Sequence, residues 1–160
     1  MPFIEIITSS ESKQQLSNFI TKVLVNNCDT MFISKENILN IKNIKLDTLV
    51  INEKITNYDI FQKIISNSKN LVFNLDENEN ILENFNGENM VISYGFNSNS
   101  DITISSIKDD EIMCYLQKTI KNLQNIIIEP QEIKVKIKRE NVDIYDIMIV
   151  IALAILYAKK

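Results

Sequence analysis

Short apolar runs alternate with longer amphipathic segments along the first 95 residues. The chain opens with an apolar run at 3–7 (FIEII) and passes through a polar segment at 8–14 (TSSESKQ). Over 15–27, apolar residues then recur at the spacing of a helix face. Strand, loop and helix in this order form the first unit of an α/β fold. The pattern therefore predicts a strand at 3–7 followed by an amphipathic helix.

Further apolar segments continue this alternation. Runs rich in β-branched residues predict strands at 30–34, 47–52, 70–74 and 90–94. A short amphipathic helix is predicted at 59–68, and a second around 79–85 that ends at Gly87 with a left-handed cap. Between 38 and 46 the apolar residues are too sparse to distinguish a helix from a loop. Repeated strand–helix units imply a mainly parallel sheet covered on both faces.

After Gly95 the period of the pattern changes to two. Residues 101–139 contain four segments of alternating polar and apolar residues, DITISSI, EIMCYLQKTI, NIIIE and EIKVKIKR, joined by short polar turns. We expect these segments to form an antiparallel sheet attached to the parallel one. Within the last segment, the lysines at 134, 136 and 138 alternate with isoleucine and valine, which is typical of the polar face of an amphipathic strand.

The final segment, 142–160, is the most hydrophobic part of the chain. From 147 to 158 the only polar side-chain group is the hydroxyl of Tyr157. A membrane span needs about 20 apolar residues, whereas this run is shorter and begins after Asp143 and Asp146. We therefore expect a buried core helix, with a partner-binding helix and a membrane anchor as the alternatives.

The amino-acid composition of the chain limits the reactions and ligands that it allows. The chain has 160 residues, two glycines, no histidine and a formal net charge of −4. Too few glycines exclude an intact Walker A loop or dinucleotide fingerprint, and the absence of histidine excludes Ser-His-Asp and Cys-His catalysis. The acidic balance argues against nucleic-acid binding. Cys28 and Cys114 lie far apart in the sequence, and we expect reduced thiols and a cytoplasmic protein.

Several motifs in the correct order resemble the central ATP-binding domain of the Mur ligases, which add amino acids to the peptidoglycan precursor. The segment after FIEII is similar to the phosphate loop T-G-T-N-G-K-T of that family, and it keeps Thr8 and Lys13. The other resembling stretches are LDTLVIN at 46–52, LVFNLDENENILENF at 71–85, VISYGFNSNSDITISSI at 91–107 and NVDIYDIMIVIALAIL at 141–156. The resemblance implies a single domain over 1–160 with a P-loop-NTPase-like (Rossmann-like) parallel part at 1–95, antiparallel strands at 96–140 and an apolar helix at 141–160.

The resemblance also implies a nucleotide site, in degenerate form. In place of the loop glycines stand Ser9 and Ser12, whose Cβ atoms hinder the approach of backbone amides to phosphate. Gln14 replaces the hydroxyl residue that holds magnesium, while Lys13 is either a remaining cation or a solvated lysine at a helix start. Asn74 and Asp76 stand where the family contacts adenosine, and the alternative for them is a strand-end turn with Asx bonding.

We therefore expect a non-catalytic, degenerate relative of the Mur ligase central domain, without the ligases' flanking domains and without a cofactor. It would act as a protein-interaction or regulatory module linked to peptidoglycan or amide-ligase biology, with a protein partner or a second copy of itself and no nucleic acid. One alternative is an adenine-nucleotide module that binds ATP and magnesium, or one part of a split ligase. Another is an unrelated α/β protein.

Overall fold

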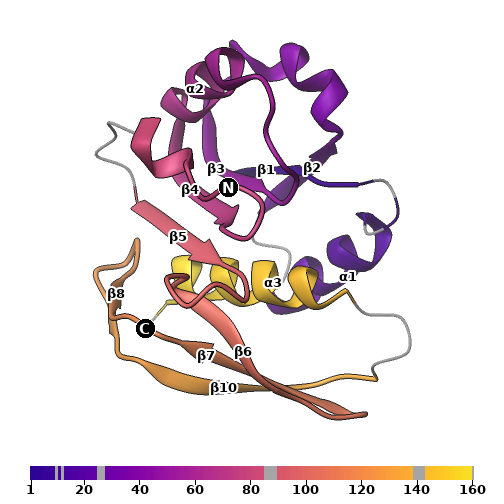
Figure 1. The fold of residues 1–160 in the computed structure, drawn as a ribbon, viewed down its shortest axis with the longest axis vertical. Coiled ribbons are helices and arrows are strands. Elements are labelled where there is room, and N and C mark those ends of the chain that lie inside the picture. The colour runs from indigo at the N-terminus through magenta and orange to yellow at the C-terminus, as the bar shows by residue number, and fades with distance from the viewer. Residues whose placement is uncertain (10, 12, 25–27, 85–89, 139–142, 160) are drawn as a thin grey trace.

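A mixed eight-stranded sheet organises the chain. The computed structural model describes residues 1–9, 11, 13–24, 28–84, 90–138 and 143–159. The strand order is β10-β7-β6-β5-β4-β3-β1-β2 (Figure 1). Pairing is parallel from β2 to β6 and antiparallel from β6 to β10. The predicted Rossmann-like α/β fold with an antiparallel extension is therefore confirmed.

The elements follow the predicted apolar runs closely. The strands of the main sheet are β1 (Phe3–Ile7), β2 (Asp29–Ile33), β3 (Leu46–Ile51), β4 (Ser68–Asn74), β5 (Met90–Tyr94), β6 (Ile102–Ile107), β7 (Glu111–Leu116) and β10 (Gln131–Lys136). The α-helices are α1 (Lys13–Leu24), α2 (Tyr58–Ser66) and α3 (Ile144–Tyr157). Two 3-10 helices, η1 (Lys35–Ile41) and η2 (Ile81–Asn84), connect strands of the parallel part.

The direction in which successive strands are added to the sheet reverses between β1 and β3. After β1 the chain crosses through α1 to β2 on one side, and it then returns past β1 to β3 on the other side. The order β2-β1-β3-β4-β5 is that of a doubly wound sheet, whose ligands bind beyond the carboxyl ends of the strands where the direction reverses. Thr8 and Asn52 directly follow these two strands.

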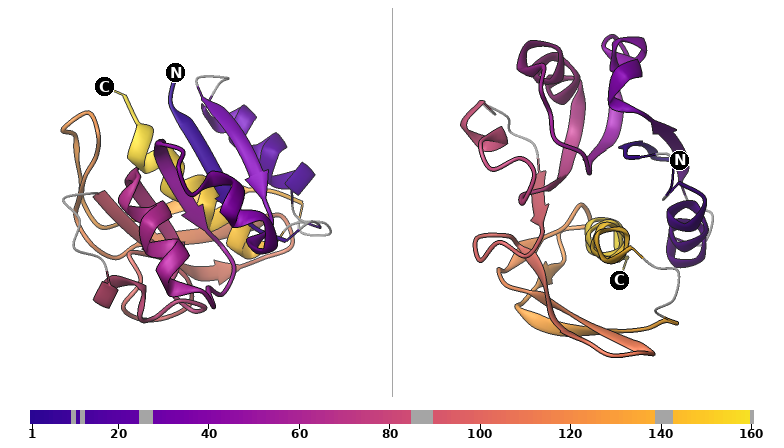
Figure 2. Two further views of the ribbon diagram at one scale, coloured as in Figure 1. Left: turned by 90° about the horizontal axis from the view of Figure 1, so that it is seen from above. Right: turned by 45° about the vertical axis from the view of Figure 1, so that its right-hand side comes forward.

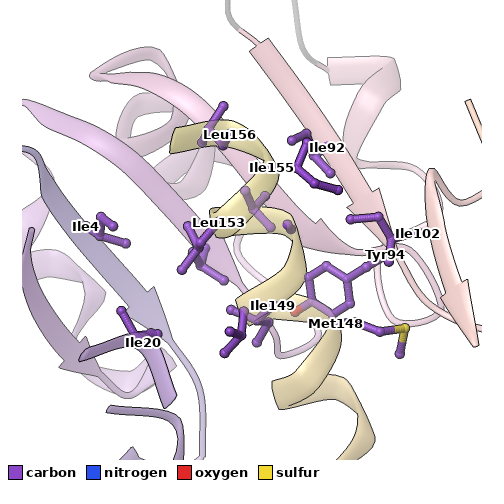
Figure 3. Close-up of a cluster of buried hydrophobic side chains, with 14 of the residues drawn as sticks. Ile4, Ile20, Ile92, Tyr94, Ile102, Met148, Ile149, Leu153, Ile155 and Leu156 are labelled. Carbon is purple, nitrogen blue, oxygen red and sulfur yellow. The ribbon is translucent and has the colours of Figure 1, made fainter. Parts of the chain in front are cut away.

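Each face of the sheet buries its own core because side chains of a strand alternate between faces. Ile4 and Ile6 of β1 join the cluster under α1 and α3, whereas Ile7 joins the cluster under α2 and η1. The sheet curls around α3. Strands β1, β3, β4, β5, β6 and β7 lie on one side of this helix, and α1 covers it on another (Figure 2). Figure 3 shows Leu153 and Leu156 of α3 inside that cluster.

The C-terminal helix is a core element, as predicted. Nine of the fourteen residues of α3 are buried. The helix runs opposite to the parallel strands: the Tyr157 hydroxyl bonds Thr48 near the start of β3, and the Tyr145 hydroxyl bonds Asp76 beyond the end of β4. Over the described residues no helix has both the length and the apolar character to cross a membrane.

Some details differ from the sequence-based expectation. The undecided segment at 38–46 begins in η1, and the second short helix is the 3-10 helix η2; its predicted end at Gly87 lies outside the described residues. The second and third of the four segments predicted as antiparallel strands also change. Residues 111–120 split into β7 and β8 (Ile120–Lys121), and β8 pairs with β9 (Ile127–Ile128) in a separate two-stranded sheet.

Asn122 explains the separate sheet. Its side-chain amide donates to the carbonyls of Ile155 and Ala158 at the end of α3, at 3.1 and 3.0 Å. Its Oδ1 accepts from the backbone N–H groups of Gln124 and Ile126, at 2.9 and 3.0 Å. One buried side chain thus closes the turn between β8 and β9 and attaches this hairpin to the end of α3, apart from the main sheet.

Candidate functional site

Polar side chains gather where the parallel strands end, on the edge that we call the carboxyl edge. Its residues are Thr8 after β1, Asn52 after β3, Asn74 and Asp76 at and after β4, Tyr94 at the end of β5, and Tyr145 and Asp146 in the first turns of α3. This is the position at which doubly wound sheets bind their ligands. The carboxyl edge is therefore the candidate functional site.

Asn52 connects the ends of four strands. Its Nδ2 donates to Thr8 Oγ1 at 3.2 Å, and its Oδ1 accepts from the Tyr94 hydroxyl at 2.7 Å and from Asn74 Nδ2 at 3.5 Å. Thr8, Asn74 and Tyr94 are buried. Burial, reinforced by the negative charge of Asp146, raises the pKa of Tyr94 well above its ordinary value, so the hydroxyl remains a donor. The centre of the site is filled by side chains that satisfy one another.

Asn74 begins the turn that follows β4. Its Oδ1 accepts from the backbone N–H of Asp76 at 3.0 Å, which is an Asx turn. Four residues later, Asn78 ties this turn to the loop after β3: Asn78 Oδ1 accepts from Ile55 N–H at 2.9 Å, and its amide donates to the Glu53 carbonyl at 2.9 Å. The loops at 53–57 and 76–80 therefore lie together.

Asp76 holds the loop after β5. Its two carboxylate oxygens accept from the backbone N–H groups of Phe96 and Asn97, at 2.8 and 2.9 Å, and Oδ2 also accepts from the Tyr145 hydroxyl at 2.9 Å. Gly95 lies directly beside this carboxylate, with φ of +149° and only 2.7 Å from its own ideal Cβ position to Asp76 Cγ. Phe96 and Tyr145 close the arrangement with their rings edge to face, 5.7 Å between centroids.

The predicted phosphate loop is only partly brought to the site. Thr8 is buried in it, and Ser9 is exposed. Lys13 is the first residue of α1 and lies near Glu53, whose pKa is raised by burial and, to a lesser extent, by Glu36, against the opposing charges of Lys35 and Lys13. Gln14 is exposed and donates to Asn18 Oδ1 at 3.2 Å, along its own helix. Ser12 lies outside the described residues.

Four further residues of the carboxyl edge were not predicted as functional: Asn52, Tyr94, Tyr145 and Asp146. Asp146 is fully buried, and among the described residues neither of its carboxylate oxygens has a hydrogen-bond partner. Burial, with a smaller contribution from Asp143, raises its pKa from 3.8 to about 7. The contacts of these unpredicted residues depend on which strands and helices are neighbours in the fold. The spacing of residues along the chain does not reveal this.

The polar groups of this edge, apart from the carboxyl of Asp146, form hydrogen bonds with one another or with the backbone. Among the described residues no group of three or more cysteines, aspartates and glutamates is placed to hold a metal ion. Both cysteines are free, and burial raises the pKa of Cys114 to about 12, which leaves it a protonated thiol. Comparison with protein-family models and with curated proteins gave no match.

Proposed function

We propose that this chain is a non-catalytic protein-interaction domain, a degenerate relative of the Mur ligase central domain that works in peptidoglycan or amide-ligase biology. The observation that carries the proposal is the state of the carboxyl edge. There the polar groups of Thr8, Asn52 and Tyr94 bond to one another instead of facing an open site.

Nucleotide binding would have to break these contacts. The amides of Phe96 and Asn97 and the Tyr145 hydroxyl are the donors nearest to Asp76, and all three are bonded to that carboxylate. These three bonds are exposed or half-buried, and the loss of a typical hydrogen bond costs about 0.5–1.5 kcal/mol. A ligand that displaced several of these bonds would lose this free energy for each bond before it formed any contact of its own.

The same contacts account for the motif positions that the chain shares with the ligases. Asn74 forms the Asx turn, Asp76 holds the loop at 95–97, and Gly95 leaves room for the Asp76 carboxylate. Each of these residues has a structural role here that needs no nucleotide. This supports a domain that keeps a ligase-like framework while working through its surface.

A nucleotide titration tests the proposal. A ligand at 100 times its Kd stabilises a protein by about 2.7 kcal/mol, which shifts Tm by several degrees in a domain of this size. We expect no shift with millimolar ATP or ADP and magnesium, and the same Tm for Lys13→Ala with and without nucleotide. A stabilisation that Lys13→Ala removes, or ATP hydrolysis with the same dependence, would show an adenine-nucleotide module and contradict the proposal.

A further inference from the structure

A groove of about 610 Å³ runs between α1 and the edge strand β10, with α3 as its floor. Phe19 and Val23 of α1 form one wall, and Val150 and Ile151 of α3 contribute to the floor. Val23 is 44% exposed although it is aliphatic. The groove therefore offers an apolar surface beside a strand that has only one neighbour.

The free side of β10 presents unpaired backbone groups to this groove. β10 is the last strand of the sheet and pairs only with β7 among the described residues (Figure 1). The amide of Ile137 donates to the Asp110 carbonyl on the β7 side, at 3.0 Å. Successive residues of a strand direct their backbone groups to opposite sides. The amides of Lys134, Lys136 and Lys138 consequently point away from β7, where a further strand can pair with them.

The charges of the groove all have one sign. Four lysines line it, Lys22 of α1 and Lys134, Lys136 and Lys138 of β10 and its continuation, and its described lining contains no acidic residue. Lys134 forms an ion pair with Glu111 at 3.4 Å. The chain as a whole carries a net charge of −4, so this is a local positive surface on an acidic protein.

The two faces of β10 differ in chemistry. Ile133, Val135 and Ile137 pack toward α3, in the cluster that contains Ile147. The alternating lysines are exposed and lie on the opposite face. A strand added beside β10 would therefore place every second side chain over the apolar floor and the side chains between them next to lysines.

We propose that the groove binds an extended segment of another protein, which pairs with β10 as an added strand and carries apolar residues alternating with aspartate or glutamate. This rests on the proposed interaction function and names its surface. A second copy of the chain fits less well, because the lysine face of β10 and its continuation carries three lysines and one acid, Glu132, so that pairing β10 with β10 would bring an excess of like charges together.

A labelled peptide, Glu-Val-Glu-Ile-Glu-Val-Glu-Ile, is a direct probe of this groove. We expect saturable binding by fluorescence anisotropy that weakens with added salt, and much weaker binding of Glu-Glu-Glu-Glu-Val-Ile-Val-Ile, which has the same composition without alternation. In amide exchange measured by NMR, the peptide should protect Lys134, Lys136 and Lys138, whose amides face the groove.

Two pairs of variants separate charge from backbone pairing. Lys136→Glu with Lys138→Glu should weaken binding by about tenfold or more, whereas Lys42→Glu with Lys45→Glu, on an exposed segment away from the groove, should change it little. Lys136→Pro removes one outward amide and should abolish binding, while Lys136→Ala keeps that amide and most of the affinity. Circular dichroism checks that each variant is folded.

The proposal is overturned if the alternating peptide does not bind at millimolar concentration, or if Lys136→Pro binds it as tightly as the unmodified chain. It is also overturned if the chain sediments as a dimer that Lys136→Pro dissociates, since a second copy would then occupy the strand edge. Absence of both peptide binding and nucleotide binding rejects this groove alone. Nucleotide binding that depends on Lys13 rejects the proposed function, whatever the peptide does.

Discussion

At the scale of single residues, one carboxylate connects several parts of the carboxyl edge. Asp76 joins the turn after β4 to the loop after β5 and to the first turn of α3. Of its three donors, Phe96 is exposed, and Asn97 and Tyr145 are half-buried. Gly95 is the position where that arrangement has least tolerance, because its backbone conformation and its neighbour both exclude a side chain.

Gly95→Ala should destabilise the protein by more than about 1 kcal/mol, because the added methyl group meets the Asp76 carboxylate and φ is positive. Chemical denaturation of the single variants and of the double variant with Asp76→Ala measures the coupling. We expect the double variant to lose less than the two single losses added together, since Asp76→Ala removes the clash. Additive losses would show that backbone strain alone is responsible.

At the scale of elements, the end of α3 depends on a side chain from another part of the chain. The last carbonyls of a helix have no partner within the helix, and buried ones need an external donor. Here Asn122 supplies that donor to Ile155 and Ala158. The β8–β9 hairpin therefore acts as a cap for the core helix, although its two strands contribute no pairing to the main sheet.

Asn122→Ala should lower the free energy of unfolding by about 2–4 kcal/mol, because it leaves buried carbonyls at the end of α3 and turn amides unsatisfied. Asn125→Gly is the matched control in the same turn: Asn125 is exposed with φ of +60°, a conformation that glycine adopts readily. Urea denaturation compares the two. Equal effects of both variants would contradict the capping role.

At the scale of the whole molecule, the sequence predicts the layers well and the site poorly. The strands at 3–7 and 90–94 are apolar runs between polar residues, and the structure has them at the same positions. The segment at 38–46 was undecided because the 3-10 helix in which it begins, with Ile38 and Ile41 buried, fits neither the α nor the strand period. The partners of Asn52 depend on strand order, which local patterns do not contain.

Buried acidic residues show most clearly what the pattern of hydrophobic and polar residues does not predict. Glu5 belongs to an apolar run, and its position looks like any other of strand β1. In the structure it is fully buried on the face covered by α2 and η1, and neither of its carboxylate oxygens has a hydrogen-bond partner in the part of the chain that the structure describes. Burial raises its pKa from 4.5 to about 7. With Asp146 on the opposite face, each side of the sheet buries an acidic residue that has no hydrogen-bond partner among the described residues.

These two acids should make the protein less stable as the pH rises from about 4 to about 7. In that range the unfolded chain releases both protons while the folded chain keeps them, so the free energy of unfolding falls with pH and becomes level above about 7. One pKa unit corresponds to about 1.4 kcal/mol, which gives a loss on the order of 3–4 kcal/mol for each acid. Glu5→Gln and Asp146→Asn remove the ionisation at similar volume. In urea denaturation at pH 4.5 and pH 8, the double variant should therefore show a much smaller difference between the two pH values than the unmodified chain, and each single variant an intermediate one. Stability of the unmodified chain that rises between these pH values, with the double variant following it, would show that Glu5 and Asp146 do not remain protonated in the fold.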